Sequence, residues 1–154
     1  MVAMAALLAA TPCIAAELPS LGDAPPAITL PNLSGKTIEL TDFSGKNTII
    51  TFFASWSKSC QAELINLQEL KDELGASLEV YAISFDKRSK ALAEYTEKNN
   101  LSLNFLIDKK LTSLNKYAIL IIPTTFCINP EGKIDRIFVD YDENVKQALS
   151  DWLK

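Results

Sequence analysis

The sequence predicts one α/β domain, built as a mixed central β-sheet flanked by helices with a β-hairpin in front of it. Residues 48–54, TIITFFA, form an unbroken β-branched and aromatic run that is typical of a central strand buried on both faces. Helical and strand patterns then alternate, which favours parallel neighbours, and a short turn joins the last two strands, which favours an antiparallel pair. A length of 154 residues with 48% hydrophobic content suits a single domain with its own core.

Two segments precede the expected domain, which we place at residues 28–154. Residues 1–16, MVAMAALLAATPCIAA, are apolar and end in alanines, which is typical of the hydrophobic part and cleavage zone of an export signal. They are too few to span a bilayer. They contain no basic residue of the kind that opens such a signal, so an apolar N-terminal tail is the alternative. Residues 17–27 carry three prolines and a glycine, which predicts an extended lead-in.

The first half of the domain begins with residues 28–40, ITLPNLSGKTIEL, which predict two short strands joined by a turn. The central strand follows. From Ser57 the apolar period changes to 3.6 residues per turn, which predicts a helix whose inner arc carries Cys60 and several leucines. Gly75 supplies the stop of this helix.

The second half of the domain continues the alternation of strands and helices, and a Pro-Glu-Gly turn joins its last two strands. The predicted strands are 78–84, 103–107, 124–129 and 133–139, and the predicted helices are 87–99, 111–117 and a closing helix with an apolar stripe at Val145, Ala148, Leu149 and Trp152.

Composition excludes several classes of function. The net charge is −4 without a basic stripe, so the electrostatic footprint that nucleic acid requires is missing. The absence of histidine removes Cys-His and Ser-His catalysis and the commonest transition-metal ligand. The three cysteines form no C-x-x-C pair, which argues against structural zinc. We therefore expect no metal, no other cofactor and no nucleic-acid partner.

Several separate segments resemble one family in order and spacing. The stretch DAPPAITLPNLSGKTIELTDFSGKNTIITFFASW leads into a helix start of the form W-x-x-x-C, and LEVYAIS and KYAILIIPTTFCINPEGKI follow. Over residues 22–154 this layout resembles the thioredoxin superfamily, and within it the TlpA/ResA-like extracytoplasmic thiol-disulfide oxidoreductases, or redoxins. The resemblance implies a thioredoxin-like fold, thiol-disulfide exchange with cysteine-containing proteins or peptides, and a role in cell redox homeostasis.

The resemblance also implies where the site lies. The family's motif after the tryptophan is C-x-x-C, and in this chain Ser57 stands in place of the first cysteine and Cys60 in place of the second. Trp56 matches the aromatic residue that flanks the site. Ile122 and Pro123 match the segment that binds substrate opposite the helix start, with Pro123 as a cis-proline. A trans-proline at the start of an edge strand is the alternative.

Glu79 matches an acidic residue that the family places beneath the active site, where it assists proton transfer to and from the second thiol. A carboxylate within an apolar strand is costly unless it has such a purpose or reaches water. The alternative is an ordinary carboxylate near the end of a strand.

Serine at position 57 changes the chemistry that such a site can perform. In the family, the first thiol attacks a substrate disulfide from the helix N-terminus and the second resolves the mixed disulfide. A hydroxyl forms no stable S–S bond, and no histidine is present to activate it. Ser57 would then cap the helix or tune Cys60 through a hydrogen bond. Cys60 would be either an inert core thiol or a reactive one.

Cys127 is expected to be a packed core residue without a bond to Cys60. It lies four residues beyond Pro123, about 13 Å along an extended strand, whereas a disulfide needs Cα atoms within about 7 Å.

The leading functional interpretation is a TlpA/ResA-like protein whose dithiol activity is lost or reduced to single-thiol chemistry at Cys60, with an external thiol or redox partner resolving the mixed disulfide. One alternative is a peroxidase, because peroxiredoxins carry Thr or Ser three residues before their reactive cysteine, although Phe53 stands where their motif has proline. Another is a non-catalytic module that binds extended peptides beside Pro123. Ser57 could also be an engineered substitution of the kind used to trap mixed disulfides.

Residues 1–16 and the family resemblance together predict the location of the protein. We expect export to the bacterial periplasm or the outer face of the cytoplasmic membrane, with no membrane span in the mature chain. That compartment permits disulfides.

Overall fold

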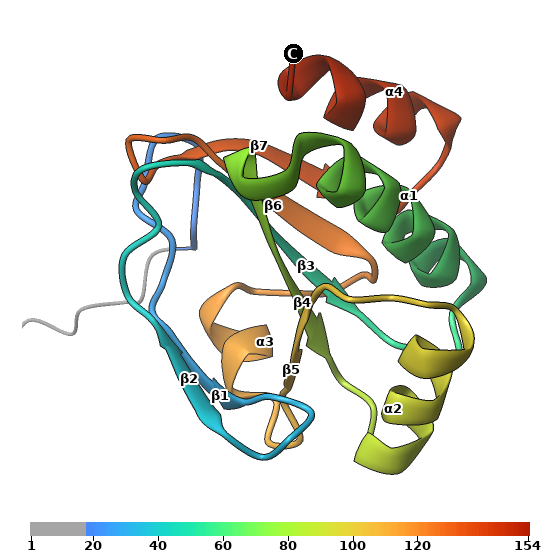
Figure 1. The fold of residues 1–154 in the computed structure, drawn as a ribbon. Coiled ribbons are helices and arrows are strands. Elements are labelled where there is room, and N and C mark those ends of the chain that lie inside the picture. The colour runs from blue at the N-terminus through green and yellow to red at the C-terminus, as the bar shows by residue number, and fades with distance from the viewer. Residues whose placement is uncertain (1–17) are drawn as a thin grey trace, which may run out of the picture.

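A five-stranded sheet forms the centre of the protein in the computed structural model, which describes residues 18–154 (Figure 1). The strand order is β5-β4-β3-β6-β7, in which β3, β4 and β5 are parallel and β6 and β7 pair antiparallel. The predicted mixed sheet is therefore confirmed. The strands are β1 (Ile28–Pro31), β2 (Thr37–Leu40), β3 (Asn47–Phe53), β4 (Leu78–Ser84), β5 (Asn104–Ile107), β6 (Thr124–Ile128) and β7 (Ile134–Val139).

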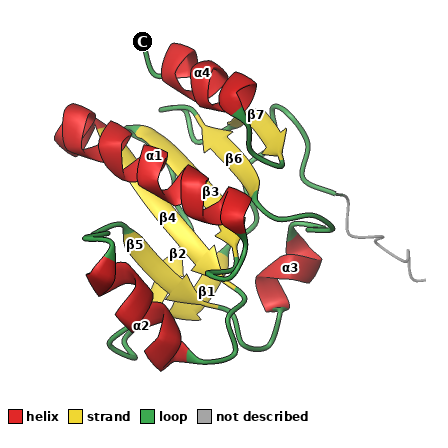
Figure 2. Ribbon diagram, turned by 90° about the vertical axis from the view of Figure 1, so that its right-hand side faces the viewer, coloured by secondary structure: helices red, strands yellow, loops and turns green. Residues whose placement is uncertain are grey.

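Helices cover one face of this sheet, and the hairpin β1–β2 together with α3 covers the other (Figure 2). Both the predicted hairpin and the predicted flanking helices are confirmed. None of the helices within residues 18–154 is long and apolar enough to cross a bilayer. The helices are α1 (Lys58–Leu74), the 3-10 turn η1 (Gly75–Ser77), α2 (Ser89–Lys98), α3 (Thr112–Lys116) and α4 (Glu143–Trp152).

The chain before the hairpin is neither helix nor strand over residues 18–27. Two backbone hydrogen bonds attach it to the start of β7: Gly22 N–H donates to the Ile134 carbonyl at 2.8 Å, and Ile134 N–H donates to the Asp23 carbonyl at 2.9 Å. The predicted export signal at residues 1–16 lies outside the described residues.

The core consists of two apolar layers separated by the sheet. Alternate residues of a strand point to opposite faces, so Ile49 and Phe53 pack with the leucines of α1, whereas Ile50 and Phe52 pack beneath the hairpin. All four side chains are fully buried. The prediction of a central strand buried on both faces is confirmed.

The helix α3 begins later than the predicted residue 111, for a local reason. Leu111 has a left-handed backbone conformation with φ of 57°, which ends the preceding turn. The buried Asp108 carboxylate then accepts the amides of Thr112 at 2.9 Å and Ser113 at 2.7 Å, which satisfies the free donors of the first helical turn.

The aromatic packing around Phe52 generates a stability prediction. Its ring lies 4.9 Å from that of Tyr117 and 5.9 Å from that of Phe126, measured between centroids. We expect Phe52→Ala to lower the free energy of unfolding by about 3–5 kcal/mol, because it leaves a cavity in a closed layer. Leu120→Ala, at a side chain that is 95% exposed, should change it by less than about 0.5 kcal/mol. Urea unfolding measures both, and equal effects would contradict the assignment of this layer.

Candidate functional site

The corner between β3 and α1 is shaped by a turn and a helix cap. Ser57 N–H donates to the Ala54 carbonyl at 3.1 Å, which closes the turn after the strand. Ser57 has an extended backbone and is the N-cap of α1, and its Oγ accepts the amide of Cys60 at 3.5 Å. The same Oγ lies 3.3 Å from Ser59 Oγ. The helix-capping role considered for Ser57 is therefore present in the structure.

Of the cysteines within residues 18–154, only Cys60 lies at this corner, and its side chain is 0% exposed. Burial raises the pKa of the Cys60 thiol, and hydrogen bonds with the Ser57 side chain and the Ala54 backbone only partly oppose this. The nearby carboxylates of Glu63 and Asp140 raise the pKa further. Cys60 is therefore a protonated, enclosed thiol at neutral pH, whereas nucleophilic attack requires an accessible thiolate.

Glu63 lies one helical turn beyond Cys60 and is completely buried. Its two carboxylate oxygens accept hydrogen bonds from Thr51 Oγ1 at 2.7 Å and Thr125 Oγ1 at 2.6 Å. Burial outweighs these bonds and raises the pKa of Glu63 from 4.5 to about 7. Glu63 was missed in the sequence, although an acidic residue three positions after Cys60 on the inner arc was the signal for it.

Glu79 is not brought to this site, so its predicted position beneath the active site is corrected. It pairs with Thr48 near the start of β3, about 16 Å along the strand from the corner at Phe53. Its carboxylate lies 3.4 Å from Lys46 Nζ and accepts a hydrogen bond from Asn104 Nδ2 at 2.5 Å. The buried acidic side chain close to Cys60 is Glu63.

Pro123 lies beside the corner because β6 pairs with β3. Phe52 faces Thr124 in the register, which places Pro123 next to the end of β3. The Ile122–Pro123 peptide bond is cis. The Pro123 carbonyl accepts the amide of Asp140 at 2.8 Å, which fixes it to the end of β7, and Ile122 packs against both apolar layers.

Trp56 is 75% exposed, and the loop that carries it is held from below by Asp86. The Asp86 carboxylate accepts both the backbone amide and the hydroxyl of Ser55 at 2.9 Å. Ser84 Oγ donates to the same carboxylate at 2.6 Å, and Gln61 Nε2 donates to the Ser55 carbonyl at 2.6 Å. No local pattern indicates Asp86 as a site residue, because its role depends on the pairing of β3 with β4.

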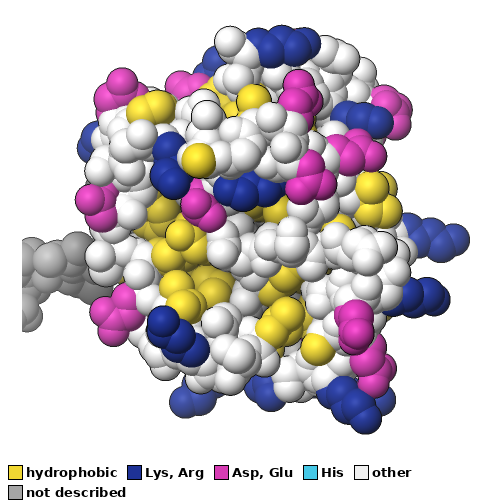
Figure 3. All heavy atoms as spheres, in the orientation of Figure 1, with side chains coloured by type: hydrophobic (Ala, Val, Ile, Leu, Met, Phe, Trp, Pro, Cys, Tyr) yellow, Lys and Arg dark blue, Asp and Glu magenta, His cyan; other side chains and the backbone are white. Residues whose placement is uncertain are grey.

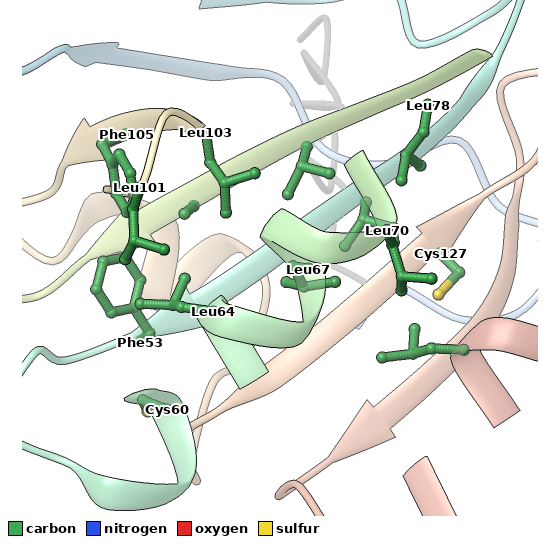
Figure 4. Packing of buried hydrophobic residues seen from close by; sticks show 14 of the residues in the cluster. Phe53, Cys60, Leu64, Leu67, Leu70, Leu78, Leu101, Leu103, Phe105 and Cys127 are labelled. Carbon is green, nitrogen blue, oxygen red and sulfur yellow. The ribbon is translucent and has the colours of Figure 1, made fainter. Parts of the chain in front are cut away.

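Cys127 lies away from the corner, at the other end of the row of leucines on α1 (Figure 4). It pairs with Ile49 in the middle of β3, is fully buried, and is free. The prediction of a packed core cysteine without a bond to Cys60 is confirmed. Within residues 18–154, no group of three or more His, Cys, Asp or Glu side chains is placed to hold a metal ion.

Comparison with known proteins identifies the family to which the chain belongs. The sequence pattern of the AhpC/TSA family matches residues 21–137, which is most of the chain and includes the corner and Pro123. The chain belongs to the AhpC/TSA family.

Within the AhpC/TSA family, the chain is similar to thiol-disulfide oxidoreductases. The ResA thiol-disulfide oxidoreductase of Bacillus thuringiensis subsp. konkukian is 30% identical over 139 residues, which cover 90% of this chain and 79% of ResA. The thioredoxin-like protein YneN of Bacillus subtilis is 31% identical over 121 residues, which cover 77% of this chain and 71% of YneN. The predicted resemblance to ResA-like proteins is confirmed.

A solved structure confirms the fold class. The thioredoxin domain of a thiol-disulfide oxidoreductase from Bacteroides vulgatus superposes with a TM-score of 0.75 at 23% identity, covering 88% of this chain and 99% of that domain. This AhpC/TSA family member therefore has the predicted thioredoxin-like fold.

The buried carboxyl group of Glu63 predicts a pH-dependent stability. Its pKa is raised in the folded protein, so the folded state holds a proton that the unfolded state releases. The resulting stability is fully present below pH 4.5 and is lost as the pH rises through about 7, by about 3 kcal/mol in all. The free energy of unfolding, measured in urea, should be lower at pH 8 than at pH 5.

Glu63→Gln should remove this fall, because glutamine stays neutral and has nearly the same shape. Glu69→Gln, at an exposed position of the same helix, is the control and should keep it. Parallel pH profiles for wild type and Glu63→Gln would contradict the assignment.

Proposed function

We propose that this protein binds cysteine-containing polypeptides at the corner formed by Trp56, Ser57 and Pro123 without a dithiol–disulfide cycle of its own. The observation that carries the proposal is the complete burial of Cys60 behind a serine N-cap. Its relatives named as thiol-disulfide oxidoreductases support the choice of thiol-containing polypeptides as the partner class.

A dithiol cycle stores two electrons in a pair of thiols and gives them up when one S–S bond forms and two protons are released, so it needs two sulfurs within bonding distance. Ser57 supplies an oxygen at the first position. Cys127 is on another element and is buried among the leucines of α1. Within the described residues, Cys60 therefore has no second cysteine with which to form a disulfide.

Single-thiol chemistry at Cys60 is disfavoured by the same geometry. The Cys60 sulfur would have to reach the disulfide of a substrate, and its side chain has no exposed surface. Its raised pKa also keeps the thiolate fraction low. Peroxide reduction at Cys60 would face both obstacles. We therefore favour loss of activity over reduction to a single thiol.

The polypeptide-binding part of the proposal rests on surface that the corner exposes. Trp56 offers a large exposed aromatic face in the loop that follows β3, and Pro123 lies next to the end of β3. Aromatic side chains and free backbone groups are two of the means by which proteins bind extended peptides.

Export of the protein to the periplasm or the outer face of the cytoplasmic membrane is part of the proposal. The apolar residues 1–16 support it. An enzymatic reporter fused after residue 27 should become active outside the cytoplasm, and should stay inactive there when residues 1–16 are deleted. Export of the deleted form would contradict a signal in residues 1–16.

Ser57→Cys tests whether the missing nucleophile is what prevents catalysis. We expect wild type to leave the rate of insulin disulfide reduction by dithiothreitol unchanged, and Ser57→Cys to raise it at least about tenfold, because the new thiol stands at the helix N-terminus.

Ser59→Cys is the matched control, since it adds a thiol two residues further along at a half-buried position without creating a C-x-x-C pair. It should leave the rate at the uncatalysed level. Unaided insulin reduction by wild type, or equal gains in the two variants, would contradict the proposal.

A further inference from the structure

An apolar groove of about 290 Å³ lies beside the corner, along the chain that connects α3 to β6. Its floor includes Phe126 and Ile137 from β6 and β7, and its rim includes Leu120, Ile121 and Val139. No charged side chain is among the described residues that line it. In the view of Figure 3, apolar side chains gather near the middle of the molecule, and charged side chains lie just above them and toward the edge.

The rim of this groove is unusually exposed for apolar side chains. Leu120 is 95% exposed, Val139 is 54% exposed and Ile121 is 53% exposed. Leu18, which also lines the groove, is 64% exposed. Single exposed apolar residues need no explanation, but four around one hollow mark a surface that is covered when the protein acts.

The groove is continuous with the proposed binding corner. Ile121 and Thr124 line it, and they flank Ile122 and Pro123 in the chain. Among residues 18–154, the backbone amides of Ile121 and Ile122 donate no hydrogen bond. A polypeptide that lies along Pro123 therefore meets free backbone donors first and the groove next.

The size and chemistry of the groove favour a side chain over a small cofactor. Pockets for small molecules are usually about 300–1,000 Å³ and largely enclosed, with a few convergent polar groups. This groove lies at the lower end of that range and is open. Among the described lining residues only Thr124 and Tyr117 carry a polar group, and the Tyr117 hydroxyl already donates to the Pro26 carbonyl at 2.7 Å. The groove suits one large aliphatic or aromatic side chain.

We infer that the apolar groove is a specificity subsite for the polypeptide that binds at the corner. It takes a large aliphatic or aromatic side chain located a few residues to one side of the bound cysteine. This inference rests on the proposed function, and it adds the class of sequence that the site selects.

The test uses fluorescein-labelled nine-residue peptides of sequence GSGSCGSGS, each with leucine at one of the eight other positions, kept reduced and titrated with the full chain. Leucine at positions on a single side of the cysteine should lower the Kd about tenfold in fluorescence anisotropy, because burial of its side chain stabilises the complex. Leu120→Asp should abolish this gain and leave the leucine-free peptide unchanged. Leu33→Asp, at an exposed apolar residue in the hairpin turn, should keep the gain.

Trp56→Ala tests the binding corner separately from the groove, because it should weaken the binding of every peptide. Binding that responds to Trp56→Ala but gains nothing from leucine, or keeps the gain in Leu120→Asp, would overturn the subsite and leave the corner intact. Absence of peptide binding by wild type would overturn both. A dimer that sedimentation detects and Leu120→Asp dissolves would make the groove an interface between two copies, which also overturns the inference.

Discussion

The pairing of β3 with β4 on one side and β6 on the other is the constraint from which the site follows. Because β3 is central, both of its faces must be apolar, and the polar end of the strand is the first place where the chain can turn outward. The β6 register then brings Pro123 to that end from 70 residues further along the sequence. The β4 register brings Asp86 beneath the Trp56 loop by the same logic.

The environment of Cys60 differs from that of a reactive helix-terminal thiol. A thiol at the N-cap would be exposed and stabilised as a thiolate by the free amides and the helix dipole. Cys60 lies one turn inside, where its own amide is bonded to Ser57 Oγ and its sulfur faces the core. Glu63 and Asp140 add negative charge nearby, which favours the protonated thiol further. Burial and charge thus act in the same direction, and the hydrogen bond with Ser57 only partly opposes them.

Most elements could be predicted because their signals are local. The run of β3, the leucine arc of α1 and the turn before β7 all depend on residue spacing within one segment. The acidic residue of the site, Glu63, was missed although its signal is also local, since it lies three positions after Cys60 on the inner arc of α1. Alternation along β4 places Glu79 on the same face as Tyr81 and Ile83, away from α1, and only the register shows that it is also at the wrong end of β3.

The central claim is that the folded protein encloses the thiol of Cys60, and site-resolved alkylation tests it most directly. Iodoacetamide modification of Cys60, followed by peptide mass spectrometry, should be at least about a hundredfold slower in the native protein than in urea, because reaction waits for an opening of the structure. Comparable rates in the two states would show an accessible thiol at the corner and would contradict the account.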